Sequence, residues 1–165
     1  MLEQLKELLE MQRVLDENIL REKGITEYPL DNMKIALFVE LGELMNEFPT
    51  KFKHWKSSAV DNREKGLVEY VDCLHFALSL ANYYSEDSEK YILPYNAVEI
   101  QVSIESNTYM ATLNKIVNYM DWNNIFYAFV YLFVLGNKLG FTWEEIYSAY
   151  KKKNEVNYQR LRNGY

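Results

Sequence analysis

The sequence Glu40-Leu41-Gly42-Glu43 lies inside an apolar helical run and has a counterpart in Glu69-Tyr70-Val71-Asp72. Residues at positions i and i+3 share one face of an α-helix, so each pair points two carboxylates in one direction. Two such helices facing each other gather four carboxylates, which are unfavourable away from water unless they are protonated, paired or bound to a cation. Mg²⁺ prefers oxygen ligands of this kind. The two pairs therefore predict a magnesium site formed by Glu40, Glu43, Glu69 and Asp72.

The first pair also fits a simpler interpretation. Glu40, Glu43 and Glu47 form one strip with Ala36 at helical spacing, and such a strip can be the solvated face of an amphipathic helix. The strip is thin, however, and apolar residues fill most of the remaining circumference. We therefore expect a helix that is buried on nearly all sides, with its glutamates in a wet cleft.

The second pair lies in a stretch, 67–80, that is apolar on almost every side. A solvated face does not explain Glu69 and Asp72 in such a helix, which is typical of a central, buried element. Buried ion pairs with Lys34 or Arg63 remain the alternative to a metal site.

Composition limits the class of protein. A chain of 165 residues, 48% hydrophobic and 25% charged, fits one domain over 1–165. The net charge of −6 argues against direct nucleic-acid binding, and the lone Cys73 fits a reducing compartment. The N-terminus is charged, unlike a signal peptide, and the longest apolar run, 125–135, is too short to span a bilayer. We expect a cytoplasmic protein without membrane contact.

Hydrophobic periodicity predicts an all-α bundle of five to six helices. Asp31 is the expected N-cap of the second helix, and Thr142, with Glu145 in a capping box, begins the last. Residues 85–106 form an irregular insertion, in which alternation over 98–104 favours a short strand or an extended lid. The expected helices cover residues 2–22, 32–47, 63–84, 108–119, 122–139 and 143–161.

E-x-x-E followed by E-x-x-D on two antiparallel helices resembles the metal-binding signature of the all-α nucleoside triphosphate pyrophosphohydrolases. This superfamily includes the MazG-like proteins and the dimeric dUTPases. The C-terminal sequence, 153–165, is similar to the dimeric dUTPase tail, K-N-x-x-N-x-x-R ending in N-G-Y. Lys153, Asn157 and Arg160 share one helical face that suits a phosphate chain. A basic C-terminal helix favoured by the macrodipole is the alternative.

Three further matches extend the resemblance over residues 9–165. Leu9-Glu10-Met11-Gln12 is similar to the family's N-terminal motif, whose Gln contacts uracil. Phe52-Lys53-His54-Trp55-Lys56 resembles the F-K-x-W segment, where Trp stacks on the base and a nearby Lys reaches phosphate. Phe76 matches the aromatic residue that packs on deoxyribose. Taken singly, Gln12 fits a surface residue and Trp55 a core anchor.

The chain also departs from the family pattern in places. Residues 86–106 match nothing in the common core. Asp16 stands where some relatives carry Asn, and Cys73 follows the last metal ligand, where we expect it to serve packing.

The resemblance implies a phage-type, homodimeric dUTP diphosphatase that converts dUTP, and also dUDP, to dUMP with Mg²⁺, two ions being bound with substrate. Glu43 is the expected general base. Gln12 or Asn157 can pair with uracil through an amide, and Trp55 can exclude the thymine methyl group. The expected phosphate ligands are Lys56, Lys153, Arg160 and Tyr165, and the expected uracil and deoxyribose contacts are Gln12, Trp55, Phe76 and Asn157.

Two other functions remain open at this point. The chain can act on another nucleoside triphosphate within the same superfamily. It can also be a helical interaction protein, because some phage-encoded members of the family are bound by a repressor protein. The apolar run 125–135 is a candidate dimer face, unless the core of the monomer buries it.

Overall fold

The structure, a computed structural model, describes residues 2–84, 107–121 and 125–164. These ranges contain helices and no strand, so the predicted all-α bundle is confirmed. The predicted insertion at 85–106, its candidate strand and Tyr165 lie outside the described residues. The elements are α1 (Leu2–Glu22), α2 (Leu30–Asn46), the 3-10 helix η1 (Pro49–Lys51), α3 (Arg63–Tyr84), α6 (Tyr109–Asn118), α7 (Ile125–Lys138) and α8 (Trp143–Arg162).

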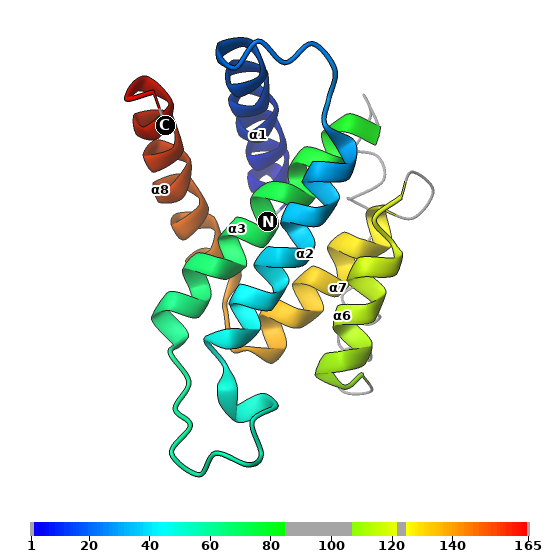
Figure 1. Ribbon diagram of the computed structural model, residues 1–165, viewed down its shortest axis with the longest axis vertical. Coiled ribbons are helices and arrows are strands. Elements are labelled where there is room, and N and C mark those ends of the chain that lie inside the picture. The colour runs from blue at the N-terminus through cyan, green and yellow to red at the C-terminus, as the bar shows by residue number, and fades with distance from the viewer. Residues whose placement is uncertain (1, 85–106, 122–124, 165) are drawn as a thin grey trace.

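Helix α3 is the central element of the bundle (Figure 1), packing against α1, α2, α7 and α8. It runs antiparallel to α2, and the segment 47–62 connects the two at one end of the molecule. Its buried side chains include Tyr70, Leu74 and Leu78, which are fully enclosed. The prediction that 67–80 belongs to a central, largely buried helix is therefore confirmed.

Local sequence signals place most helix ends correctly. Gly24, with a φ of +66°, follows the end of α1, and Thr142 forms the predicted capping box with Glu145. The N-cap prediction for the second helix is wrong, because α2 begins one residue before Asp31 and follows Pro29 without a side-chain cap. Asp31 lies instead in the first turn, where its negative charge interacts favourably with the helix dipole.

Helix α2 is less buried than predicted. Its core contacts come from the single stripe Leu37, Leu41 and Leu44, which are at most 3% exposed. On the opposite side Ile35, Phe38 and Val39 are 63%, 60% and 47% exposed. The amphipathic pattern of α2 is therefore split into a buried apolar stripe and an exposed apolar stripe, with the glutamates between them.

The apolar run 125–135 belongs mainly to the core. Phe129, Leu132 and Leu135 on α7 are buried, whereas Tyr127 is 45% exposed. Burial within the monomer thus explains this run, as the second interpretation of its sequence expected. In the described ranges no single helix combines the length and apolar character needed to cross a membrane. Helices α7 and α8 meet both requirements only as a pair, with a bend of 109° between them.

Candidate active site

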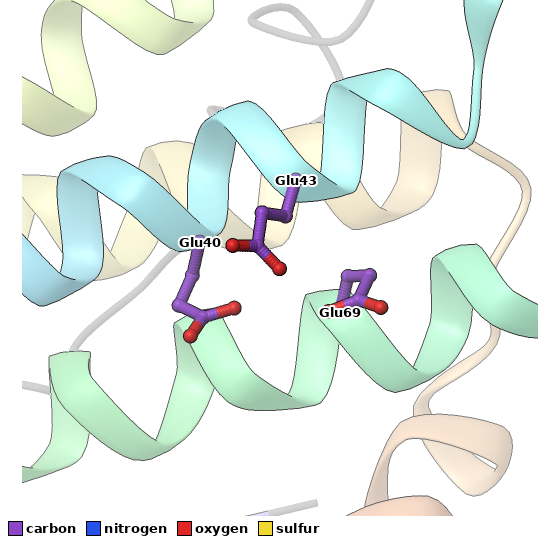
Figure 2. Close-up of side chains that lie close together, drawn as sticks. All are labelled: Glu40, Glu43 and Glu69. Atoms are coloured by element: carbon purple, nitrogen blue, oxygen red, sulfur yellow. The ribbon is translucent and has the colours of Figure 1, made fainter.

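Three carboxylates from neighbouring helices point toward one another across α2 and α3 (Figure 2). Glu40 and Glu43 project from α2, and Glu69 projects from α3. One oxygen from each lies within 4.8 Å of the others. The two helices that carry the predicted acidic pairs therefore bring these three predicted ligands together.

The clustering changes the acidity of these groups. Burial, followed by repulsion from Asp72, Glu43 and Glu69, raises the pKa of Glu40 to about 7. Burial and the negative charge of Asp72 also raise the pKa of Glu69. Both shifts reflect burial first and crowded negative charge second, and a bound cation would favour the ionised form of each carboxyl.

Asp72 is held differently from the other three carboxylates. Its Oδ2 accepts a hydrogen bond from Lys153 Nζ at 2.5 Å, and both side chains are less than a fifth exposed. Lys153 lowers the pKa of Asp72, but burial outweighs this effect and the pKa is raised overall. The ion pair joins α3 to α8 across 81 residues of sequence.

The two basic residues considered as ion-pair partners for this helix have other contacts. Arg63 bonds Glu145 and the carbonyl oxygen of Gly140. Lys34 lies 5.7 Å from the ring centre of Tyr84. The alternative interpretation named the wrong partners, because Lys153 and not Lys34 or Arg63 forms the ion pair with Asp72.

A cavity of about 400 Å³ opens beside the carboxylates, between α1, α3, α8 and the start of α2. Glu40 and Asp72 belong to its wall, so the acidic cluster and the cavity are continuous. Five predicted substrate contacts line the same cavity: Gln12, Phe76, Lys153, Asn157 and Arg160.

Trp55 and Lys56 do not line this cavity. Both are exposed in the segment between η1 and α3, and Trp55 is 69% exposed with its ring edge-to-face against His54. The alternative view of Trp55 as a core anchor is therefore wrong. The predicted roles of Trp55 and Lys56 in substrate binding stay predictions.

The wall of the cavity also contains polar residues that the sequence did not mark as functional. They are Asp16 and His75, with Tyr28 nearby on the same wall. Burial raises the pKa of Asp16 to about 6 and lowers that of His75 to about 3. Each lies one helical turn from a predicted site residue, Gln12 or Asp72, and that spacing was the only signal available.

The donor set fits a hard divalent cation. Carboxylate oxygens from Glu40, Glu43 and Glu69 converge, and the fourth carboxylate, Asp72, is paired with Lys153, whose charge also acts on Glu40 and Glu69. Such an all-oxygen set suits Mg²⁺, which keeps part of its shell for water and phosphate.

Comparison with known proteins identifies the chain's relatives. A family model described as dUTPase matches residues 4–165. No curated protein matches the sequence. The matched range contains both acidic pairs, the cavity and the C-terminal helix, so the chain belongs to the all-helical dUTPase family, whose members hydrolyse dUTP.

Proposed function

We propose that this enzyme hydrolyses dUTP, and also dUDP, in a reaction that depends on Mg²⁺. The observation that carries the proposal is the convergence of Glu40, Glu43 and Glu69 within 4.8 Å at the edge of a cavity that also contains Lys153 and Arg160. Hydrolysis of a triphosphate is favoured by metal ions at the reacting phosphorus and by basic side chains along the rest of the phosphate chain.

The carboxylates would hold the metal, and two ions fit four carboxylates when substrate phosphates complete the shell. Asp72 would join the set when Lys153 moves from it to a phosphate. Bound Mg²⁺ supplies charge neutralisation of the phosphates and an attacking water of lowered pKa.

The protein's own groups then divide the remaining work. Glu43 would accept a proton from a water molecule between the helices, a role supported by its exposed position beside Glu40. Lys153 and Arg160 are about two turns apart on α8 and would stabilise charge on the leaving pyrophosphate. Cleavage of dUTP in this way yields dUMP and pyrophosphate.

The nucleoside would occupy the deeper part of the cavity. Phe76 on α3 offers an apolar surface for deoxyribose, and Gln12 and Asn157 offer amide groups to the base. A cavity of about 400 Å³ matches the volumes of small-ligand sites in proteins.

The test is pyrophosphate release from a panel of nucleoside triphosphates and dUDP, with Mg²⁺ or with a chelator. We expect turnover of dUTP with Mg²⁺ and none after chelation. Glu43→Gln should lower kcat by at least ~100-fold, as expected for loss of a general base. Glu155→Gln, a change to an exposed residue of α8, is the matched control and should leave the rate unchanged.

Other outcomes of the same panel identify the competing functions. Faster turnover of a different triphosphate would make this chain a pyrophosphohydrolase for that nucleotide. No turnover of any nucleotide, together with stabilisation by a repressor-type protein, would favour an interaction protein.

We further propose that the enzyme is a homodimer. The exposed apolar stripe on α2, formed by Ile35, Phe38 and Val39, supports this proposal because isolated monomers rarely expose contiguous apolar surface. Sedimentation analysis of the wild type and of Phe38→Glu tests it. If Phe38→Glu is as dimeric as the wild type, the apolar stripe on α2 does not form the interface. The phage-type origin and the relation to MazG-like proteins stay predictions.

A further inference from the structure

Gln12 is the centre of a buried hydrogen-bond network on the wall of the cavity. The residue is 3% exposed. Its Oε1 lies 2.6 Å from Nδ1 of His75 and 2.8 Å from the hydroxyl oxygen of Tyr150. Its Nε2 donates to Asp16 Oδ1 at 2.7 Å. Three partners from three helices therefore bind one amide group.

These contacts fix which way the amide points. Asp16 is ionised at neutral pH, because its pKa, although raised by burial, is about 6. An ionised carboxylate only accepts hydrogen bonds, so the nitrogen of Gln12 must face Asp16. The opposite orientation would place two oxygens against each other in a region with little water. The oxygen of Gln12 therefore faces His75 and Tyr150.

The orientation in turn fixes the tautomer of His75. Because an amide oxygen cannot donate, Nδ1 of His75 carries the hydrogen. Burial lowers the pKa of the imidazole to about 3, so the ring is neutral and Nε2 is an acceptor. Within the described residues Nε2 has no hydrogen-bond partner. The ring also stacks on Tyr150, with centroids 4.1 Å apart and planes 19° apart.

Both lone-pair directions of the Gln12 oxygen are used by these two donors. One hydrogen of Nε2 is bound to Asp16, and the described residues provide no acceptor for the other. Since Gln12 lines the cavity, the group that it offers to a ligand is an N–H and not a carbonyl oxygen.

We infer that His75 and Tyr150 are positioning residues that hold the Gln12 amide in a donor-only orientation and so select a base with a carbonyl acceptor. The inference rests on the proposed function, because it assigns a role within the same dUTP site. Uracil carries a carbonyl oxygen at C4, which accepts from the Gln12 N–H. Cytosine carries an amino group there, which would face another donor.

This inference narrows the role that the sequence predicted for Gln12. A free amide can donate to a uracil carbonyl and also accept from its N3–H. In the structure the Gln12 oxygen is already occupied by two donors. The partner for N3–H must therefore come from another group on the wall, where Asp16, Asn157 and the unpartnered Nε2 of His75 are among the acceptors.

The experiment compares kcat/KM for dUTP and dCTP in four variants of the full chain. Tyr150→Phe removes one donor and keeps the ring. The side chains introduced by His75→Leu and His75→Asn have nearly the same shape, but only asparagine has an N–H that can donate to the Gln12 oxygen. Tyr147→Phe is the matched control. It also removes a tyrosine hydroxyl from α8, but this hydroxyl donates to Glu7 and not to Gln12.

We expect Tyr150→Phe and His75→Leu each to lower the dUTP/dCTP ratio about tenfold, the effect of one ordinary hydrogen bond. The loss should appear as a higher KM for dUTP with nearly unchanged kcat, because the base lies away from the reacting phosphorus. His75→Asn and Tyr147→Phe should retain the ratio. Lower stability without a change in ratio would mean a purely structural role and would overturn the inference.

A nitrogen NMR spectrum of the wild type supplies a test that needs no variant. We expect His75 to be protonated at Nδ1 and unprotonated at Nε2 at pH 7, and the reverse tautomer would overturn the inference. Wild-type protein that hydrolyses no dUTP would instead refute the proposed function. Normal dUTP preference that is unchanged in both donor-removing variants would refute only the positioning role.

Discussion

Replacement of Glu40 by Gln should make the metal-free protein more stable at alkaline pH. In the folded chain the pKa of Glu40 is about 7, and its ordinary value is 4.5. Below pH 4.5 the group is protonated in both the folded and unfolded states and has no effect. As pH rises from 4.5 to 7, the unfolded state loses its proton first, so folding stability falls. Above pH 7 the full penalty remains.

The size of this penalty follows from the shift. A pKa difference of this size corresponds to about 3 kcal/mol at full effect. Glu40 is only partly buried, and solvent screening reduces the interaction, so we expect ~1–2 kcal/mol. For a chain of this length that is roughly 3–6 °C in Tm. Glu40→Gln carries no ionisable group and should escape this loss.

The assay is urea unfolding in the presence of a chelator at pH 5 and pH 8. The free energy of unfolding of Glu40→Gln should exceed that of the wild type at pH 8 and nearly equal it at pH 5. Mg²⁺ should then stabilise the wild type at pH 8 much more than the variant. Glu155→Gln controls for loss of a surface charge. An equal difference at both pH values, or a less stable Glu40→Gln at pH 8, would refute the reasoning.

Four more predictions concern stability. Lys153→Met should lower the free energy of unfolding by about 2–4 kcal/mol without metal, because it leaves a buried carboxylate unpaired; recovery on adding Mg²⁺ in thermal melts checks it, and no loss would contradict it. Gly66→Ala should destabilise by about 1–3 kcal/mol because the new Cβ overlaps the Phe48 ring. Gly42→Ala, with open space around it, should stabilise the fold by ~0.5–1 kcal/mol. Urea unfolding measures both variants, and a Gly66→Ala protein more stable than Gly42→Ala would contradict the packing argument. His75 has a folded pKa of about 3 against 6.5, so stability should fall as pH drops below 6.5, and less so in His75→Asn.

The helices could be predicted from the sequence because their signals are local. The period of apolar residues and caps such as Thr142 with Glu145 depend on neighbours within a turn or two. The i, i+3 spacing of the acidic pairs likewise fixes the direction of their side chains before any tertiary contact is known. These features account for the correct prediction of α3 and for the grouping of Glu40, Glu43 and Glu69.

Features that depend on tertiary packing could not be predicted in the same way. Helix α2 has two apolar stripes, and periodicity does not tell which of them meets the core. The partner of Asp72 is 81 residues away, and nearer basic residues offered equal charge. The roles of His75 and Tyr150 depend on the orientation of one amide, which only the assembled helices determine.

The ion pair between Asp72 and Lys153 has a consequence for synthesis on the ribosome. The carboxylates on α2 and α3 are made well before α8, since Lys153 follows Asp72 by 81 residues. At roughly 5–20 residues per second this delay is on the order of 4–16 s. During that time the nascent hairpin of α2 and α3 lacks its later counter-charge from α8. Mg²⁺ bound at the proposed site would supply a counter-charge during this interval and so favour early pairing of these two helices.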